Sequence, residues 1–176
     1  SSKKEEQEGK LKLALVTPFP PEKSGISYYS SELVDYLATY YDVSVVTTAE
    51  SHGSWNISSR GYEIISISEF MNRSFKFDRV VYQFGNSEFH THMWDLISWV
   101  PGVAVIHDFF VGDALACLEA EGRNNLLAEQ LYLSHGYNAL RNLVGMEGKR
   151  SVIRNYPLSF GLISNADGVI VHSEHA

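Results

Sequence analysis

Short apolar runs alternate along this chain with longer segments in which apolar residues recur every three or four positions. The runs are typical of buried strands, and the longer segments are typical of amphipathic helices. The strands are predicted at residues 11–17, 42–48, 62–68, 79–86, 102–110 and at the start of 168–176. Helices are predicted at 26–40, 87–100, 157–167 and within 112–148, with breaks near 121–125 and 145–148.

Strands that are separated by long helical stretches favour a parallel sheet, because parallel neighbours need long crossover connections. Helices cover both faces of such a sheet. We therefore predict the α/β fold class, with a doubly wound, mostly parallel sheet and helices on both faces. Residues 11–176 are predicted to form this one domain. Residues 1–10, which are charged and lack an apolar pattern, are predicted to form a disordered tail or linker.

The composition fits a soluble globular protein and narrows its partners. The 176 residues are 44% hydrophobic and 20% charged, and the formal net charge is −7. That charge argues against a nucleic-acid partner, which would select a basic face. Cys117 is the single cysteine, so no internal disulfide forms. No apolar run approaches the ~20 residues of a transmembrane helix, and we expect a cytoplasmic domain.

Polar residues follow several predicted strands at the point where each strand ends. His107 and Asp108 follow the apolar run VAVI, and Gly85, Asn86 and Ser87 follow the run RVVYQF. The carboxyl ends of parallel strands meet at one edge of the sheet, where ligands bind in doubly wound folds. His107 therefore marks either the exit of a strand into a binding cleft or simply the polar end of a strand.

The segment after the first predicted strand, PFPPEKSG, contains three prolines and ends at Gly25, where a helix begins with Ser24 as its predicted cap. A glycine at a helix entrance lets a phosphate approach closely, and the first-turn N–H groups point toward an anion. The alternative is a glycine that only makes the turn. The loop lacks G-x-G-x-x-G and G-K-[ST], so neither a dinucleotide fingerprint nor a Walker loop is present.

Histidine pairs elsewhere give little support for a metal. His90 and His92 are two residues apart, so a helix turns them to different faces, and at least one is expected in solvent. His172 and His175 could chelate a metal only if their segment were helical. We therefore predict no metal site. The sequence also has no motif of a serine hydrolase, a zincin or a thioredoxin-like protein.

Positive charge is concentrated near the end of the chain, in Arg141, Lys149, Arg150 and Arg154. These residues could face an anionic membrane surface or a phosphorylated acceptor. The alternative is an ordinary solvated helical face. Both interpretations stay open at this point.

Four blocks of the sequence resemble consecutive blocks of one enzyme family. LALVTPFPPEKSGISYYSSELVDYLA resembles the opening of the N-terminal domain of family 4 retaining glycosyltransferases, which have the two-domain GT-B fold. VVYQFGNSEFHTHMWDLI, GVAVIHDFFVGD and NADGVIVHSEHA resemble later blocks of that domain in the same order. The resemblance spans residues 11–176. It implies a Rossmann-like, acceptor-side half of a GT-B enzyme, with the C-terminal donor domain absent.

The resemblance also implies roles for individual residues. His107 matches a strand-end histidine that lines the active site, where it positions the donor sugar without acting as a covalent nucleophile. Ser24 and Gly25 match the first loop, which approaches the donor phosphates, although that family often has two adjacent glycines there. The residues that match the acceptor side are Gly85, Asn86, Ser87, His90 and Asp108.

The implied reaction transfers a sugar from a sugar nucleotide to a glycan or lipid-linked saccharide acceptor, as in polysaccharide biosynthesis. It needs no metal and no cofactor, because helix N-termini and positive side chains can stabilise the departing diphosphate. The sugar nucleotide would bind mainly to the second domain, so the isolated chain is expected to be inactive. A lipid-linked acceptor would bring the protein to the inner membrane face as a peripheral protein.

Two other functions stay open. One is a non-catalytic glycan-binding or scaffolding module that the charged tail tethers to another domain. The other is a nucleotide-binding Rossmann domain in which Glu50, after the second predicted strand, receives a ribose hydroxyl. The missing glycines of the first loop count against this second alternative.

Overall fold

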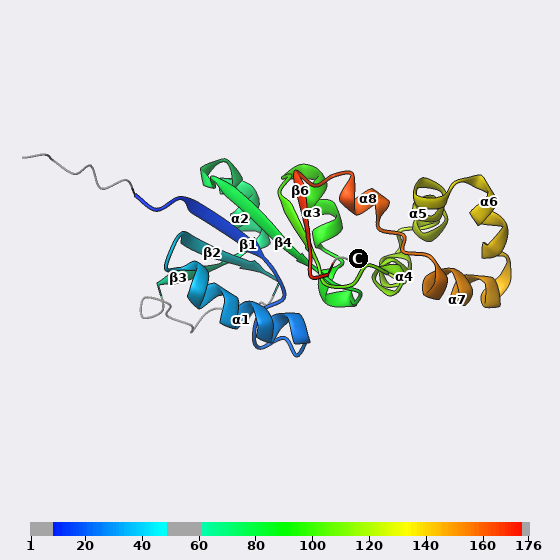
Figure 1. The fold of residues 1–176 in the computed structure, drawn as a ribbon, viewed down its shortest axis with the longest axis horizontal. Helices are drawn as coiled ribbons and strands as arrows, with labels where there is room; N and C mark the ends of the chain where they lie inside the picture. Colours follow the sequence, from blue (N-terminus) through cyan, green and yellow to red (C-terminus); the bar gives the residue numbers. More distant parts are fainter. Residues whose placement is uncertain (1–8, 49–60, 174–176) are drawn as a thin grey trace, which may run out of the picture.

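Six parallel strands form one sheet in the computed structural model of the chain, which describes residues 9–48 and 61–173 (Figure 1). The order across the sheet is β3-β2-β1-β4-β5-β6, and every neighbouring pair is parallel. This is the strand order of Rossmann-like, doubly wound folds, so the predicted fold class is confirmed. The strands are β1 (Lys12–Val16), β2 (Asp42–Thr47), β3 (Tyr62–Ser66), β4 (Arg79–Phe84), β5 (Val103–Ile106) and β6 (Gly168–Val171).

Helices lie on both faces of the sheet and connect each successive pair of strands except β2 and β3, between which residues 49–60 lie outside the described part of the chain. The α-helices of the described residues are α1 (Gly25–Leu37), α2 (Ile67–Arg73), α3 (Met93–Trp99), α4 (Gly112–Ala120), α5 (Leu126–His135), α6 (Tyr137–Leu140), α7 (Gly145–Asn155) and α8 (Phe160–Ile163). The 3₁₀ helices are η3 (Ser74–Lys76), η4 (Glu88–His90) and η5 (Arg141–Leu143). No described helix is long and apolar enough to cross a lipid bilayer.

Alternate residues of each strand face two separate hydrophobic layers. On one face, Leu13 and Leu15 of β1 pack in a cluster with Val34 of α1. On the other face, Ala14 and Val16 belong to a larger core that includes side chains of α2 through α8. Because successive side chains point to opposite faces and both faces of the inner strands are covered, β1, β2, β4 and β5 read as continuous apolar runs.

The helices between β5 and β6 form an extension of the domain. Figure 1 shows α5, α6 and α7 at the end of the molecule that lies away from β3. A close contact holds α4 against α7: a Cβ built on Gly112 would lie 2.8 Å from the Cα of Ile153. The extension therefore packs against the sheet domain through α4.

The point where the chain changes its winding direction lies between β1 and β4. β1 leads through α1 to β2 on one side, whereas β4 leads through α3 to β5 on the other side. The loops after these two strands diverge, and this is where doubly wound sheets form their ligand crevice. The loop after β5 begins beside them, because the N–H of His107 donates to the carbonyl of Phe84 at 2.9 Å.

Several predicted boundaries are wrong. The third predicted strand, 62–68, ends at Ser66, because the Ser66 hydroxyl accepts a hydrogen bond from Glu69 N at 3.2 Å and so caps the unpredicted helix α2. Serine followed three residues later by glutamate is a recognised capping signal. The predicted helix at 87–100 is the 3₁₀ helix η4 followed by α3, and the predicted strand at 102–110 ends at Ile106.

The break predicted near 145–148 is confirmed, because Val144 is extended between η5 and α7 and Gly145 has a φ of +74°. Helix α7 begins at Gly145 and continues through Gly148, where a Cβ would lie 2.6 Å from the carbonyl oxygen of Asn142. Gly148 is therefore required by close packing of α7 against the preceding turn. An unpredicted break also occurs at Gly136, whose φ of +76° is in the left-handed region that favours glycine after a helix end.

Candidate functional site

The first turn of α1 opens at the carboxyl edge of the sheet. Ser24 caps the helix as predicted, since its Oγ accepts a hydrogen bond from Ser27 N at 3.0 Å. The N–H groups of Gly25 and Ile26 make no hydrogen bond to the described part of the chain. Because the peptide dipoles of a helix sum to a partial positive charge at its N-terminus, these two N–H groups favour an anion.

Neither conformation nor packing explains the glycine at position 25. Its φ is outside the left-handed region, and a Cβ built on Gly25 has no described atom within 4 Å. A turn-making role and crowding by the described residues therefore both fail to require glycine here. The open space leaves room for a ligand to approach the backbone closely.

The loop after β4 packs directly against this first turn. A Cβ on Gly85 would lie 2.5 Å from Cδ1 of Ile26 and 2.9 Å from Cε1 of His90. Gly85 is therefore small because the loop touches both α1 and a buried imidazole. The same contact places the loop next to the helix entrance at Gly25.

Asn86 links three segments of the carboxyl edge. Its Oδ1 accepts hydrogen bonds from the N–H groups of Asp113 at 2.8 Å and Ala114 at 3.1 Å, and its Nδ2 donates to Asp113 Oδ2 at 3.0 Å. Its own N–H donates to Asp108 Oδ2 at 3.1 Å. Asn86 thus caps α4, whose N-cap residue Val111 provides no side-chain hydrogen bond. Asn86 and Asp108, both predicted to bind an acceptor, hold the loops of this edge together.

His90 lies beneath the loop after β4. It is 1% exposed, and its Nδ1 lies 3.0 Å from the Ser87 hydroxyl, while its buried Nε2 has no partner among the described residues. Burial lowers the pKa of His90 to about 4. His90, which is predicted to bind an acceptor, is therefore inaccessible to one, and its contacts support the loop.

The expectation that His90 or His92 lies in solvent is wrong. The Nε2 atom of His92 is also buried, and burial lowers the pKa of His92 to about 4. The cause is that the segment after β4 forms a 3₁₀ turn and then enters α3, so both imidazoles turn inward. An ideal helix over 87–100 would have turned them to different faces.

The imidazole of His107 lies where side chains of β4, β6 and α1 converge. Its Nε2 is 2.6 Å from Oε1 of Gln83 on β4. Its ring centroid is 4.6 Å from that of His172, directly after β6, and 5.1 Å from that of Tyr29 on α1. Burial and the neighbouring His172 lower the pKa of His107, and Asp108 opposes them. His107 is therefore a half-buried, neutral imidazole at pH 7.

Three members of this cluster, Tyr29, Gln83 and His172, are absent from the predicted site. Each carries a signal in the sequence. His172 ends a strand as His107 does, Gln83 interrupts an apolar run, and Tyr29 lies one helical turn after Gly25. Their convergence depends on the neighbourhood of β4, β5 and β6, which the order of elements along the chain does not reveal.

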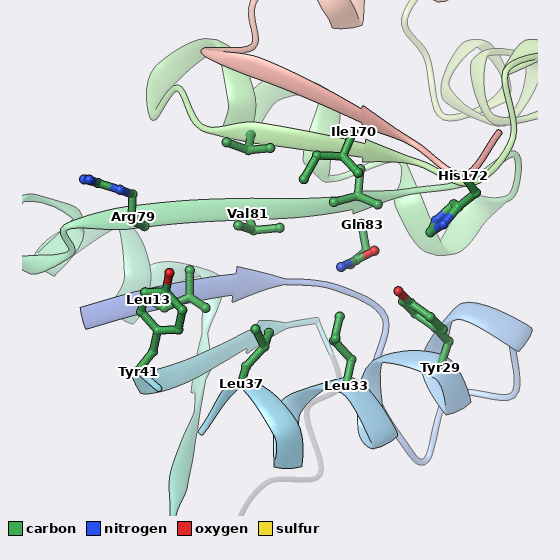
Figure 2. Close-up of a pocket in the computed structure, with 12 residues that line it drawn as sticks. Leu13, Tyr29, Leu33, Leu37, Tyr41, Arg79, Val81, Gln83, Ile170 and His172 are labelled. Atoms are coloured by element: carbon green, nitrogen blue, oxygen red, sulfur yellow. The ribbon is translucent and has the colours of Figure 1, made fainter. Parts of the chain in front are cut away.

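An apolar groove of about 390 Å³ runs along the sheet from this cluster (Figure 2). It lies between α1 and the strands β1, β4, β5 and β6. Tyr29, Gln83 and His172 form its end at the carboxyl edge, and Arg79 lies toward its other end. His107 contacts all three residues of the first end. A groove of this size with a few polar groups at one end is within the range of small-molecule sites.

A metal site finds no support among residues 9–48 and 61–173, which contain no group of three or more histidine, cysteine, aspartate or glutamate side chains that could hold an ion. His172 is engaged with two aromatic rings instead. Its proposed partner His175 lies outside the described residues, as do Glu50 and residues 1–8 of the predicted tail.

The basic residues lie in the extension, on η5 and α7. Lys149 forms an ion pair with Glu119, and Arg141, Arg150 and Arg154 are exposed. Arg150 and Arg154 are one helical turn apart on α7 and share a solvent face. Contact of these residues with an anionic surface stays a prediction.

A scan against models of known protein families finds no match to the chain, and a search of curated proteins finds none. The fold and the site together define the class of the protein. It is a Rossmann-like, doubly wound α/β protein with polar side chains gathered at the carboxyl edge of its parallel sheet.

Proposed function

We propose that the chain is the acceptor-side half of a sugar-nucleotide-dependent retaining glycosyltransferase. It would hold a glycan or lipid-linked saccharide acceptor and contribute part of the donor site. A second Rossmann-like domain would bind most of the sugar nucleotide, and the reaction would take place between the two. No metal and no further cofactor takes part in this proposal.

The observation that carries the proposal is the presence of two complementary groups at one edge of the sheet. Gly25 begins a helix whose first N–H groups are open to an anion, and His107 offers a neutral imidazole. Tyr29, one turn along α1 from Gly25, contacts the His107 ring and so connects the two. An anion site beside a hydrogen-bonding and aromatic site is what a sugar diphosphate requires.

The chemistry of each group fits glycosyl transfer. The departing diphosphate carries the negative charge that develops in the transition state, and helix N–H groups stabilise such charge without reorganisation. Sugar hydroxyls need hydrogen-bonding partners, which the imidazole and amide side chains supply. The exposed ring of Tyr29 offers an apolar surface for the face of a sugar ring. Closure of a second domain would exclude water, so that the acceptor meets the sugar in place of hydrolysis.

A transfer assay tests the proposal. The complete polypeptide encoded by the gene is incubated with radiolabelled nucleotide sugars and with extracted glycans and lipid-linked saccharides. We expect labelled product, and we expect His107→Ala to lower transfer about 100-fold because the reacting groups lose their alignment. His135→Ala is the matched control, since His135 is exposed on α5 in the extension. Undiminished transfer by folded His107→Ala protein would remove His107 from the site.

A dinucleotide is the second candidate ligand, and the strand order favours it. The order β3-β2-β1-β4-β5-β6 is that of dinucleotide-binding Rossmann domains. Against it stands the first loop, which has a single glycine in place of the G-x-G-x-x-G pattern. Calorimetry with NAD distinguishes the two: tight binding to this chain favours a dehydrogenase-type domain over the transferase.

A further inference from the structure

Gln83 places an amide in an otherwise apolar strand. It lies between Tyr82 and Phe84 on β4 and is 1% exposed. A buried amide is unfavourable unless its polar atoms find partners. Its Oε1 lies 2.6 Å from Nε2 of His107, and no other described side chain bonds to it. Figure 2 shows the amide oxygen on the side of His172 and the amide nitrogen on the side of the groove.

We propose that Gln83 is a positioning residue that holds His107 in the tautomer with the proton on Nε2. An amide oxygen only accepts hydrogen bonds, so the ring nitrogen that faces it must carry a proton. A neutral imidazole carries one N–H, and Nδ1 is therefore the unprotonated nitrogen. Nδ1 makes no hydrogen bond to the described part of the chain, and it is left to meet a ligand as an acceptor.

The surroundings of His107 keep the imidazole neutral, which the tautomer requires. The groups that face it are His172 after β6, Tyr29 on α1 and Gln83 on β4, with Asp108 and His90 in the adjoining loops. Of these, only Asp108 is an anion, and its carboxylate also accepts the N–H of Asn86. Burial and His172 outweigh it, so the pKa of His107 is lowered.

The consequence for chemistry rests on the proposed function. A neutral imidazole with an open Nδ1 accepts a hydrogen bond from a sugar hydroxyl, and it cannot supply a proton from that atom. His107 would therefore orient the sugar by accepting a hydrogen bond from one of its hydroxyl groups. Gln83 acts through His107 and does not touch the substrate itself.

Imidazole ¹⁵N NMR of the protein at pH 7.5 tests the inference, with the His107 signals assigned through a His107→Asn variant. We expect the wild-type spectrum to show a protonated Nε2 and an unprotonated Nδ1. In Gln83→Leu the tautomers should mix, because the acceptor is gone. In Gln83→Glu the added carboxylate should raise the proton affinity of His107 at least tenfold. Gln130→Leu, which alters a buried glutamine of α5, is the matched control and should leave the His107 signals unchanged.

Two results would overturn the inference: a protonated Nδ1 in the wild-type protein, or a tautomer that Gln83→Leu leaves unchanged. The wild-type spectrum decides the first of these even if a variant fails to fold. In the transfer assay, Gln83→Leu should lower kcat about tenfold and shift the acidic limb of the pH profile. If wild-type protein transfers no sugar, the proposed function is wrong. The NMR measurement of the His107 tautomer then still tests the role of Gln83, because it does not depend on transfer activity.

Discussion

Removal of the Asn86 side chain should destabilise the carboxyl edge of the sheet by a predictable amount. The Asn86→Ala change deletes the acceptor of two N–H groups in the first turn of α4 and one bond to the Asp113 carboxylate. Loss of a helix cap costs about 0.5–2 kcal/mol, and an exposed side-chain bond contributes about 0.5–1.5 kcal/mol. The free energy of unfolding should therefore fall by about 2 kcal/mol, which lowers Tm by about 4–8 °C in a domain of this size.

Urea denaturation at pH 7 measures this change from the transition midpoint at constant m. Asn138→Ala is the matched control, since Asn138 is exposed on α6 and no hydrogen bond of its side chain is seen among the described residues. The control should change the free energy of unfolding by less than about 0.5 kcal/mol. Asn86→Asp should keep the two acceptor bonds but lose stability at low salt, because it adds a carboxylate beside Asp108 and Asp113. An Asn86→Ala protein within about 0.5 kcal/mol of wild type would refute the capping role.

Three further predictions concern the two buried histidines and two glycines. Between pH 6.5 and 5 the imidazoles of His90 and His92 bind protons in the unfolded chain but not in the folded protein, where their pKa values are about 4. The free energy of unfolding should therefore fall by about 1.5 kcal/mol for each as the pH is lowered across this range. Urea denaturation between pH 6.5 and 5 measures this change, and a free energy of unfolding that does not vary with pH would contradict the burial of both rings. Gly25→Ala should leave stability within about 0.5 kcal/mol of wild type, because the site is open, and weaken sugar-nucleotide binding. Gly112→Ala should lower the free energy of unfolding by about 1–3 kcal/mol in thermal or urea unfolding, because its Cβ would meet the backbone of Ile153. Equal stability of the Gly25→Ala and Gly112→Ala proteins would contradict the packing of α4 against α7.

The fold could be predicted from the sequence because the inner strands β1, β2, β4 and β5 are buried on both faces. Runs such as LALV and VAVI need no partner information to be recognised, and the helical spacing between them requires crossovers. A predicted boundary is wrong where a local capping residue acts against the pattern of apolar residues. Ser66 ends the third strand by capping helix α2, where the apolar pattern predicts that the strand continues to residue 68.

The candidate site could be predicted only in part, and for a geometric reason. His107 and Gly25 are visible because they stand at the ends of elements, which the chain order alone reveals. Three other side chains contact His107 because β4, β5 and β6 are neighbours in the sheet and α1 packs on it. They are Gln83, Tyr29 and His172. The structural roles of Asn86 and His90 could not be predicted either, because they depend on hydrogen bonds within and between loops: Asn86 caps α4, and His90 contacts the Ser87 hydroxyl.

Titration of ¹⁵N-labelled protein with sugar nucleotides, followed by amide and imidazole NMR signals, tests the central claim most directly. A ligand held at the carboxyl edge should perturb the amides of Gly25 and Ile26 and the imidazole of His107 together, at millimolar concentration of a donor whose main site lies on a second domain. Gly25→Ala should reduce those shifts, while Asn138→Ala should leave them unchanged. Shifts confined to the extension, or none at either Gly25 or His107, would contradict the account.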